Sequence, residues 1–279
     1  MAMMKNGLAL LAIVVSASAS RAAAASLTQM PGLATSIGAG NGEVWILGAD
    51  SSTQKSIWRW NGTGWDRRPG AAVKVSVSPD GQPWVIDSGG VIYRWNGSGW
   101  DPMPGCGIDV AADMRGSALV LGCGDYPNYA PVYQWNGSVW VFRNLWMAHL
   151  AVFSYNVVVS FPPRLYFSYL TTTPWAFSYA AGVEGLFPLP LESWNGQSWD
   201  EEPDLNQYPA FDTDVLSVAD HFALTSTTHG QTNLQQWSDS DHKWIFVDDD
   251  STESAWVKIA WDGTHVWGID QDGHIFRRD

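Results

Sequence analysis

Residues 94–105 read RWNGSGWDPMPG, and residues 59–70 read RWNGTGWDRRPG, so the chain repeats one phrase almost letter for letter. In both copies an Asn-Gly pair lies between two tryptophans. Asn-Gly is favoured in tight turns because both residues tolerate a positive φ, and tryptophans on either side of such a turn face each other across two strands. The phrase therefore predicts a β-hairpin.

The tryptophan pair recurs along the chain. Four clear pairs begin at Trp60, Trp95, Trp135 and Trp194, and a degenerate pair begins at Trp237. Upstream of the hairpin lies another two-strand phrase, such as VSVSPDGQPWVID at residues 75–87, in which valines alternate before a Pro-Asp-Gly turn. One repeat therefore consists of about four strands.

These repeats predict an all-β chain, and the low content of charged residues (15%) with 18 Trp and 27 Gly agrees with that class. A four-stranded antiparallel unit cannot bury both of its faces alone, and stacking such units around an axis gives a propeller. We expect a six-bladed β-propeller over residues 26–279, with four-stranded antiparallel blades near residues 36–69, 72–104, 107–146, 150–203, 212–247 and 256–279.

The last blade lacks a fourth strand, because the chain stops after HIFRRD. The mature N-terminal segment, residues 26–35, contains QMPG, which is similar to the outgoing DPMPG segment of a blade. We expect this segment to supply the missing strand and to close the ring.

Residues 75–105, VSVSPDGQPWVIDSGGVIYRWNGSGWDPMPG, resemble the tectonin repeat of tectonins, tachylectin-like proteins and fish-egg lectins. The second blade matches the repeat nearly throughout, the first and last in large part, and the third and fifth loosely. The resemblance implies a six-bladed propeller that binds carbohydrate at sites repeated around the ring.

Residues 144–191 do not follow the pattern. The stretch from Ser154 to Pro190 is rich in Phe, Tyr and Pro, and its only charged residues are Arg164 and Glu184. A divergent blade with a long insertion and a segment of translated noncoding or frameshifted sequence are two open interpretations, and an apolar contact loop is a third. A membrane span is disfavoured because Pro162 and Pro163 interrupt the run.

Residues 1–25 have the pattern of an export signal. Lys5 precedes the apolar run LALLAIVV, and small residues follow up to Ala25. We expect cleavage between Ala19 and Ala25, an extracellular protein and no transmembrane anchor. In that setting Cys106 and Cys123, which flank two short strands, are expected to form one disulfide within a hairpin, with two reduced buried thiols as the alternative.

The net charge of −13 argues against nucleic acid and anionic membranes as partners, since both require clusters of Lys and Arg. No HExxH or Gly-x-Ser-x-Gly motif is present, so we expect no enzyme activity. The acidic run at residues 248–250 lacks the ligand spacing and glycine of a calcium loop, so we expect no metal and no cofactor.

Three turns carry N-glycosylation sequons, at Asn61, Asn96 and Asn136. The alternative is that turn geometry alone selects these asparagines.

Sugar rings stack their apolar faces on aromatic side chains and bind fixed polar groups through their hydroxyls. The repeat provides such residues at equivalent positions, with packing between blades as the alternative role for each tryptophan. Because side chains alternate along a strand, Tyr93 and Trp95 share one face and Arg94 takes the other, so the set cannot converge on one pocket. The candidate glycan-binding residues are Trp45, Trp58, Arg59, Trp84, Tyr93, Arg94, Tyr133, Trp267 and Arg277.

These observations favour a secreted multivalent lectin that recognises surface glycans. A protein-interaction propeller without a sugar site is the main alternative, and a glycan-acting propeller enzyme is another.

Overall fold

The structure is a computed structural model, and it describes most of the chain after residue 25. The described residues are 26–113, 116–124, 130–147, 149–153, 156–161, 164–170, 174–181, 186–194, 199–201, 214–219, 222–226, 232–238, 243–247 and 256–279. The predicted export signal (residues 1–25) and the acidic run at residues 248–250 lie outside them.

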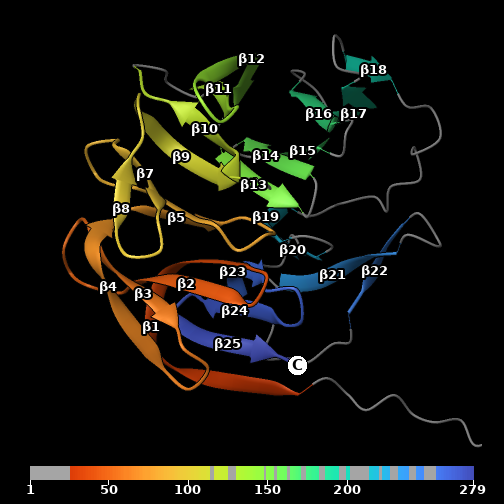
Figure 1. The fold of residues 1–279 in the computed structure, drawn as a ribbon. Helices are drawn as coiled ribbons and strands as arrows, with labels where there is room; N and C mark the ends of the chain where they lie inside the picture. The colour runs from red at the N-terminus through yellow and green to blue at the C-terminus, as the bar shows by residue number, and fades with distance from the viewer. Residues whose placement is uncertain are drawn as a thin grey trace, which may run out of the picture.

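The described secondary structure is antiparallel β-sheet (Figure 1). Three of the sheets have four strands each. They comprise β5 (Lys74–Val77), β6 (Pro83–Ile86), β7 (Ile92–Trp95) and β8 (Trp100–Pro102); β9 (Gly107–Ala112), β10 (Ala118–Gly122), β11 (Ala130–Trp135) and β12 (Trp140–Met147); and β19 (Asp214–Ala219), β20 (Phe222–Ser226), β21 (Thr232–Ser238) and β22 (Lys243–Phe246).

A fourth sheet has seven strands, because one long strand joins the two ends of the chain. Its order is β23 (Trp256–Trp261), β24 (Val266–Asp270), β25 (His274–Arg278), β1 (Leu27–Gly40), β2 (Glu43–Gly48), β3 (Lys55–Trp60) and β4 (Trp65–Ala72). The first half of β1 pairs with β25 from Leu27 to Leu33, and the second half pairs with β2 from Ala34 to Gly40. The segment before Ala34 therefore lies beside the last strand of the chain.

The segment that breaks the repeat pattern forms a six-stranded sheet, where four strands were expected. Its strands are β13 (His149–Phe153), β14 (Asn156–Phe161), β15 (Arg164–Leu170), β16 (Pro174–Ala181), β17 (Leu186–Trp194) and β18 (Trp199–Glu201), paired in sequence order. The segment is longer than the other repeats, and its additional residues pair as further strands.

The first strands of the sheets are neighbours in a circle. β1 contacts β5, β5 contacts β9, and the contacts continue through β13, β19 and β23 back to β1. Figure 1 shows the sheets fanning outward from these strands. Below, residues 34–40 of β1 with β2–β4 are called blade 1, β5–β8 blade 2 and β9–β12 blade 3, and β23–β25 with residues 27–33 of β1 are called the last blade.

The predicted tryptophan pairs are confirmed. Trp60 and Trp65 are direct cross-strand partners with ring centroids 5.0 Å apart, and Trp95 and Trp100 are paired in the same way at 5.0 Å. Trp135 and Trp140 form the third such pair, at 5.2 Å.

The turn inside each pair differs from the prediction in one respect. Gly62 has a φ of 99°, whereas Asn61 does not have a positive φ. Instead, the Asn61 side-chain Oδ1 accepts hydrogen bonds from the backbone N–H groups of Thr63 (3.0 Å) and Gly64 (2.8 Å). Asparagine is therefore selected here because its side chain caps the turn, and glycine provides the left-handed backbone.

The second tryptophan of each pair connects its blade to the preceding one. The indole Nε1 of Trp65 donates to the carbonyl of Pro31 (2.8 Å), that of Trp100 to Pro69 (2.8 Å), and that of Trp140 to Pro104 (2.6 Å). We call this contact the Trp–Pro clasp. Each proline is followed by a glycine with a φ of 87–88°, which lies against the same indole ring. The recurring Pro-Gly is therefore one half of an inter-blade contact.

A third tryptophan fills each of these junctions. Trp45 lies 5.2 Å from Trp95 and 5.7 Å from Trp100 between ring centroids, and both partners belong to the next blade. Trp267 contacts Trp60 and Trp65 in the same way, and Trp84 contacts Trp140. The exposed fractions of Trp45, Trp84 and Trp267 are 1%, 0% and 1%. The hydrophobic core thus lies between neighbouring blades.

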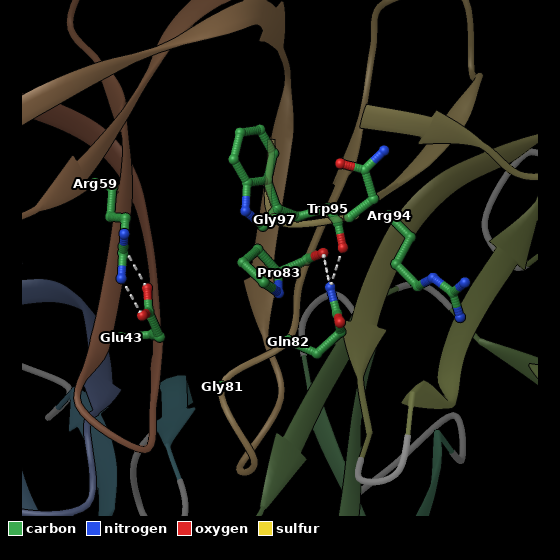
Figure 2. Close-up of a pocket in the computed structure, with 9 residues that line it drawn as sticks. Glu43, Arg59, Gly81, Gln82, Pro83, Arg94, Trp95 and Gly97 are labelled. Atoms are coloured by element: carbon green, nitrogen blue, oxygen red, sulfur yellow. Dashed lines mark hydrogen bonds and ion pairs between the residues drawn. The ribbon is translucent and has the colours of Figure 1, made fainter. Parts of the chain in front are cut away.

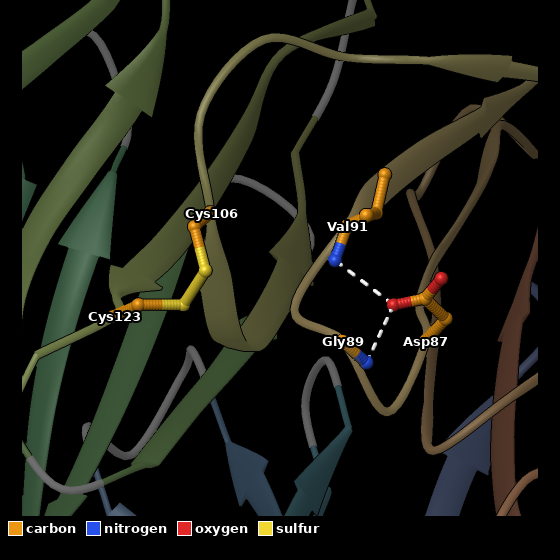
Figure 3. Close-up of a disulfide and its surroundings, with 5 residues drawn as sticks. All are labelled: Asp87, Gly89, Val91, Cys106 and Cys123. Atoms are coloured by element: carbon orange, nitrogen blue, oxygen red, sulfur yellow. Dashed lines mark hydrogen bonds between the residues drawn. A yellow bond between two sulfur atoms is a disulfide. The ribbon is translucent and has the colours of Figure 1, made fainter.

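The predicted disulfide is present. Cys106 and Cys123 are bonded at the open end of the β9–β10 hairpin, with their Cα atoms 5.5 Å apart (Figure 3). Gly90 of blade 2 packs directly on this bridge, because a Cβ built there would lie 2.5 Å from the Cys106 Sγ. The disulfide therefore also contributes to the contact between blades 2 and 3.

The clasp predicts that its glycine is sensitive to substitution. Gly105→Ala should destabilise the protein by about 1–2 kcal/mol, because Gly105 has a φ of 87° and an added Cβ would lie 3.4 Å from Trp140. Gly99→Ala is the matched control, since nothing lies within 4 Å of its Cβ position and its φ is not positive. Urea unfolding should show a lower midpoint for the first variant alone, and equal midpoints would contradict this role of the clasp.

Candidate functional site

Each buried junction tryptophan has an arginine directly across from it on the neighbouring strand. The cross-strand partners are Trp45 with Arg59, Trp84 with Arg94, and Trp267 with Arg277. Because β2, β6 and β24 begin just before these tryptophans, the arginines lie near the loop end of each blade. The tryptophan is buried and the arginine reaches the surface. We call the surface around each of these arginines (Arg59, Arg94 and Arg277) the rim of its blade.

In blade 1 a carboxylate joins the two residues. Glu43 accepts a hydrogen bond from the Trp45 Nε1 (3.0 Å) and another from the Arg59 Nε (2.7 Å), both at Oε2. A second guanidinium nitrogen of Arg59 binds the other oxygen of Glu43. These hydrogen bonds raise the pKa of Arg59 above its ordinary value. Glu43 and Arg59 thus present a fixed, bidentate pair of donors and acceptors.

This ion pair forms one wall of a cleft of about 560 Å³ between blades 1 and 2, which we call the junction cleft. Gln82 lies on the opposite side, where its Nε2 donates to the carbonyls of Trp95 (2.7 Å) and Pro83 (3.3 Å). Figure 2 shows these groups around the cleft, with Arg94 directed away from the Glu43–Arg59 pair. The main lining residues are Glu43, Arg59, Gln82, Arg94, Trp95 and Asn96.

The junction cleft combines an aromatic ring with polar groups. Trp95 is partly exposed, and the Glu43–Arg59 pair supplies both donors and acceptors. Asn96 contributes little, because its Oδ1 accepts from Ser98 and Gly99 and its Nδ2 donates to Asp101. An arrangement of this kind suits a ligand with several hydroxyl groups and one apolar face.

The structure does not support three of the predicted glycan-stacking residues. Trp45, Trp84 and Trp267 have no free face, because each is buried between two blades. Their predicted role as ligand platforms is therefore replaced by the alternative role of packing between blades.

Trp58 lies in a different place from Arg59. It lines a second cleft, of about 330 Å³, with Asp50, Gln54 and Arg67, and its Nε1 donates to the Ser56 hydroxyl (2.7 Å). Hydrogen bonds from Ser56 hold the pKa of Asp50 below its ordinary value. Adjacent positions on β3 thus point to two separate clefts, as strand alternation requires.

The remaining predicted residues are engaged within the protein. The Tyr93 hydroxyl donates to Asp87 (3.3 Å), and burial raises the pKa of Tyr93. Tyr133 packs against Phe142 with ring centroids 5.6 Å apart. The Arg277 guanidinium lies 6.0 Å from the centre of the Trp267 ring, and its Nε donates to Asp279 (2.7 Å). Of the predicted set, only Arg59 and Arg94 line the junction cleft.

The side chains that complete the cleft were missed by sequence reasoning. Glu43 and Gln82 each lie two residues before a junction tryptophan, and that recurring spacing was the signal that could have found them. The sequence predicts Trp95 only as a hairpin residue.

The three sequon asparagines are exposed but differ in their contacts. The Nδ2 of Asn61 donates to Asp66 (2.8 Å) and that of Asn96 to Asp101 (2.6 Å). At Asn136 the corresponding position is Val141, which has no acceptor side chain. Use of these sites for glycosylation stays a prediction.

One cluster of possible metal ligands occurs in the described part of the chain, at Asp270, Asp272 and His274. The Asp270 Oδ1 accepts from the backbone N–H groups of Asp272 (2.9 Å) and His274 (2.8 Å), and the other oxygen lies 2.9 Å from the His274 ring. Asp87 caps the corresponding turn of blade 2 in the same way (Figure 3). Turn geometry therefore accounts for the cluster.

Asp262 accepts a hydrogen bond from the indole of Trp267, the junction tryptophan of the last blade. Its environment predicts that the stability of the protein depends on pH in the acid range. Burial acts to raise its pKa, but hydrogen bonds from Trp267, His265 and Thr264 outweigh burial, so its pKa is below the ordinary value. A carboxyl with a lowered pKa in the folded state stabilises the protein above about pH 4 and loses this effect as the pH falls through the folded-state pKa.

We therefore expect Asp262→Asn to lower the thermal midpoint at pH 6 and to reduce the further loss between pH 4 and pH 2. Asp272→Asn, at an exposed turn position, is the control and should retain the acid dependence of the parent protein. An unchanged acid dependence in Asp262→Asn would contradict the assignment.

No described helix is long and apolar enough to cross a membrane.

Comparison with known proteins identifies the repeat. Residues 33–126 match the family model of the tectonin domain, which confirms the resemblance found in the sequence. The search of curated proteins gave no match.

Several solved structures are similar over most of the chain. A chain of the mitotic checkpoint complex has a TM-score of 0.54 at 11% identity, with 97% of this chain and 98% of that chain covered. Virginiamycin B lyase from Staphylococcus aureus has a TM-score of 0.52 at 12% identity (91% and 99% covered). The β-propeller domain of Myceliophteria thermophila Cps50 (Swd1) has a TM-score of 0.51 at 9% identity (91% and 99% covered).

At these identities the similarity shows the fold alone. The chain has an all-β, propeller-type fold, and its residues 33–126 match the tectonin domain.

Proposed function

We propose that this protein is a secreted, multivalent, non-catalytic lectin that binds surface glycans at its blade junctions. The junction cleft carries this proposal, because it places a partly exposed Trp95 opposite the fixed Glu43–Arg59 pair. Carbohydrate sites combine such an aromatic surface with a few oriented polar groups. The tectonin match supports the same class of function.

The repeat supports several sites in one molecule. Arginine lies across from the junction tryptophan in the last blade, blade 1 and blade 2, so three consecutive blades carry rims of related composition. Weak sites on one rigid body gain avidity when a surface carries many copies of the glycan.

We further propose that the fold is a six-bladed ring closed by residues 26–35. The pairing of β1 with β25 and the circle of first strands support closure. At the end of this pairing the Asp279 N–H donates to the Ser26 carbonyl (3.0 Å), and the Ser26 hydroxyl donates to the Asp279 carboxylate (2.9 Å).

Secretion is part of the proposal. The pattern of residues 1–25 and the Cys106–Cys123 disulfide support it, since disulfides persist in oxidising compartments.

A glycan array probed with the mature protein tests the function. We expect at least one glycan class to bind, and Arg59→Ala to weaken that binding by about tenfold or more, because a charged hydrogen-bond partner is lost. Arg67→Ala, an exposed arginine of blade 1 outside the junction cleft, should bind as the parent does. Circular dichroism confirms that both variants are folded. Absence of binding to every glycan, or full binding by Arg59→Ala, would refute the proposal.

A protein-interaction propeller is the competing function, and one observation favours it. The β11–β12 hairpin exposes two apolar side chains, Val139 (56%) and Phe142 (42%). Under this alternative the array is blank and Phe142→Ser abolishes association with a partner.

A further inference from the structure

The three rims differ in one group, the carboxylate beside the junction tryptophan. In blade 1 the Glu43 carboxylate accepts from both the Trp45 indole and the Arg59 guanidinium. In the last blade two carboxylates share this role, with Asp262 bound to the Trp267 indole (2.8 Å) and Asp279 to Arg277 (2.7 Å). In both blades the protein supplies an anion for the indole and for the arginine.

Blade 2 has the same tryptophan and arginine but supplies no anion for them. The residue two positions before Trp84 is Gln82, and its amide nitrogen is used by the carbonyls of Trp95 and Pro83. The Trp84 Nε1 is buried without a hydrogen-bond partner. A buried N–H without a partner is unfavourable, so the Trp84 N–H calls for an acceptor.

Arg94 also lacks a carboxylate partner among the described residues. Its guanidinium lies 5.8 Å from the centre of the Trp84 ring, and among the described residues no carboxylate pairs with it. The cross-strand partner of Arg94 is Asp101, whose Oδ1 accepts from Asn96. Blade 2 therefore has two neighbouring donors without an anion, whereas the equivalent donors are paired with carboxylates in blade 1 and in the last blade.

We propose that the rim of blade 2 binds the carboxylate of an acidic sugar in the position that the Glu43 side chain occupies in blade 1. In this arrangement the Arg94 side chain moves away from the face of the Trp84 ring and donates to one carboxylate oxygen. The movement uncovers the Trp84 N–H, which donates to the same oxygen or to the other one. Gln82 and Arg94 also line the junction cleft, so a glycan seated there can extend its acidic group to this rim. The inference rests on the proposed lectin function and narrows its ligand to glycans with a carboxylate.

The net charge of the protein opposes the binding of an acidic glycan. A net charge of −13 repels anions, so an acidic glycan binds only where a local cation and N–H donors outweigh that repulsion. At low ionic strength the net negative charge is less screened and weakens the binding of an acidic glycan. The local attraction to Arg94 opposes this effect, so the loss should be smaller than the net charge alone predicts.

Two substitutions test the site in opposite directions. Gln82→Glu places a carboxylate where blade 1 has one, and that group can no longer donate to the Trp95 carbonyl, so it turns to Trp84 and Arg94 and fills the site. Glu43→Gln removes the built-in carboxylate of blade 1 and leaves Trp45 and Arg59 in the state of Trp84 and Arg94. The first change is expected to close a site, and the second to open one.

The measurement is isothermal titration with glucuronic acid and with glucose, together with an array of sialylated and desialylated forms of the same glycans. The parent protein should prefer the acidic member of each pair. Gln82→Glu and Arg94→Gln should each reduce that preference by about tenfold or more. Glu43→Gln should add a second glucuronate site, and Arg67→Gln should leave the preference unchanged.

Each outcome separates this inference from the proposed function. Equal binding of acidic and neutral partners by the parent, or an unchanged preference in folded Gln82→Glu and Arg94→Gln, overturns the carboxylate site while the lectin function stands. Glucuronate binding that is lost in Gln82→Glu, with no glycan bound on the array, supports the carboxylate site and refutes the lectin function.

Discussion

The hydrogen bond from an indole N–H to the carbonyl of a proline in the preceding blade is the contact on which the rest of this fold depends. It occurs between Trp65 and Pro31, Trp100 and Pro69, and Trp140 and Pro104. A four-stranded sheet has two apolar faces and can bury them only against other sheets. The clasp fixes how far apart and at what angle these faces meet, and the glycine after each proline lets the backbone lie against the ring. The N-terminal segment takes part through Pro31, so the clasp also fixes the start of the described chain to blade 1.

This packing determines where a ligand can bind. The described tryptophans of the hairpin pairs and junctions pack at the contacts between blades, where their ring centroids lie 5.0–6.2 Å apart. A ring that closes a junction has no face left for a sugar. Under the proposed lectin function, recognition therefore falls to the rim, where Arg59, Arg94 and the side chains around them reach solvent. Because the junction beneath is rigid, the rim groups are held in place without a ligand, which reduces the entropy lost on binding.

Much of this could be predicted from the sequence, and the limits have physical causes. The hairpins, the tryptophan pairs and the Cys106–Cys123 bridge follow from turn residues and short-range spacing. Strand alternation accounts for Trp58 and Arg59 lining separate clefts, although Arg94 and Trp95 both line the junction cleft. Alternation does not say which face another blade will cover, so Trp45, Trp84 and Trp267 remained candidate glycan residues. The Glu43–Arg59 pair joins residues on different strands, and only the register of β2 and β3 brings them together. The six-stranded sheet over residues 149–201 was missed because the sequence before Trp194 lacks the Asn-Gly turn and tryptophan pair that mark the other blades.

The repeat also shows how one architecture permits sites of different chemistry. The clasp and the junction tryptophan are constrained by packing, so a change there affects two blades at once. The residue two positions before that tryptophan is constrained far less, and it is Glu43 in blade 1, Gln82 in blade 2 and His265 in the last blade. In blade 1 this residue, Glu43, accepts from both the indole N–H and the arginine, so exchanging this one side chain changes the charge of the rim and the donors left without a partner. A propeller of this kind can therefore present rims of distinct specificity while every junction retains the same tryptophan packing.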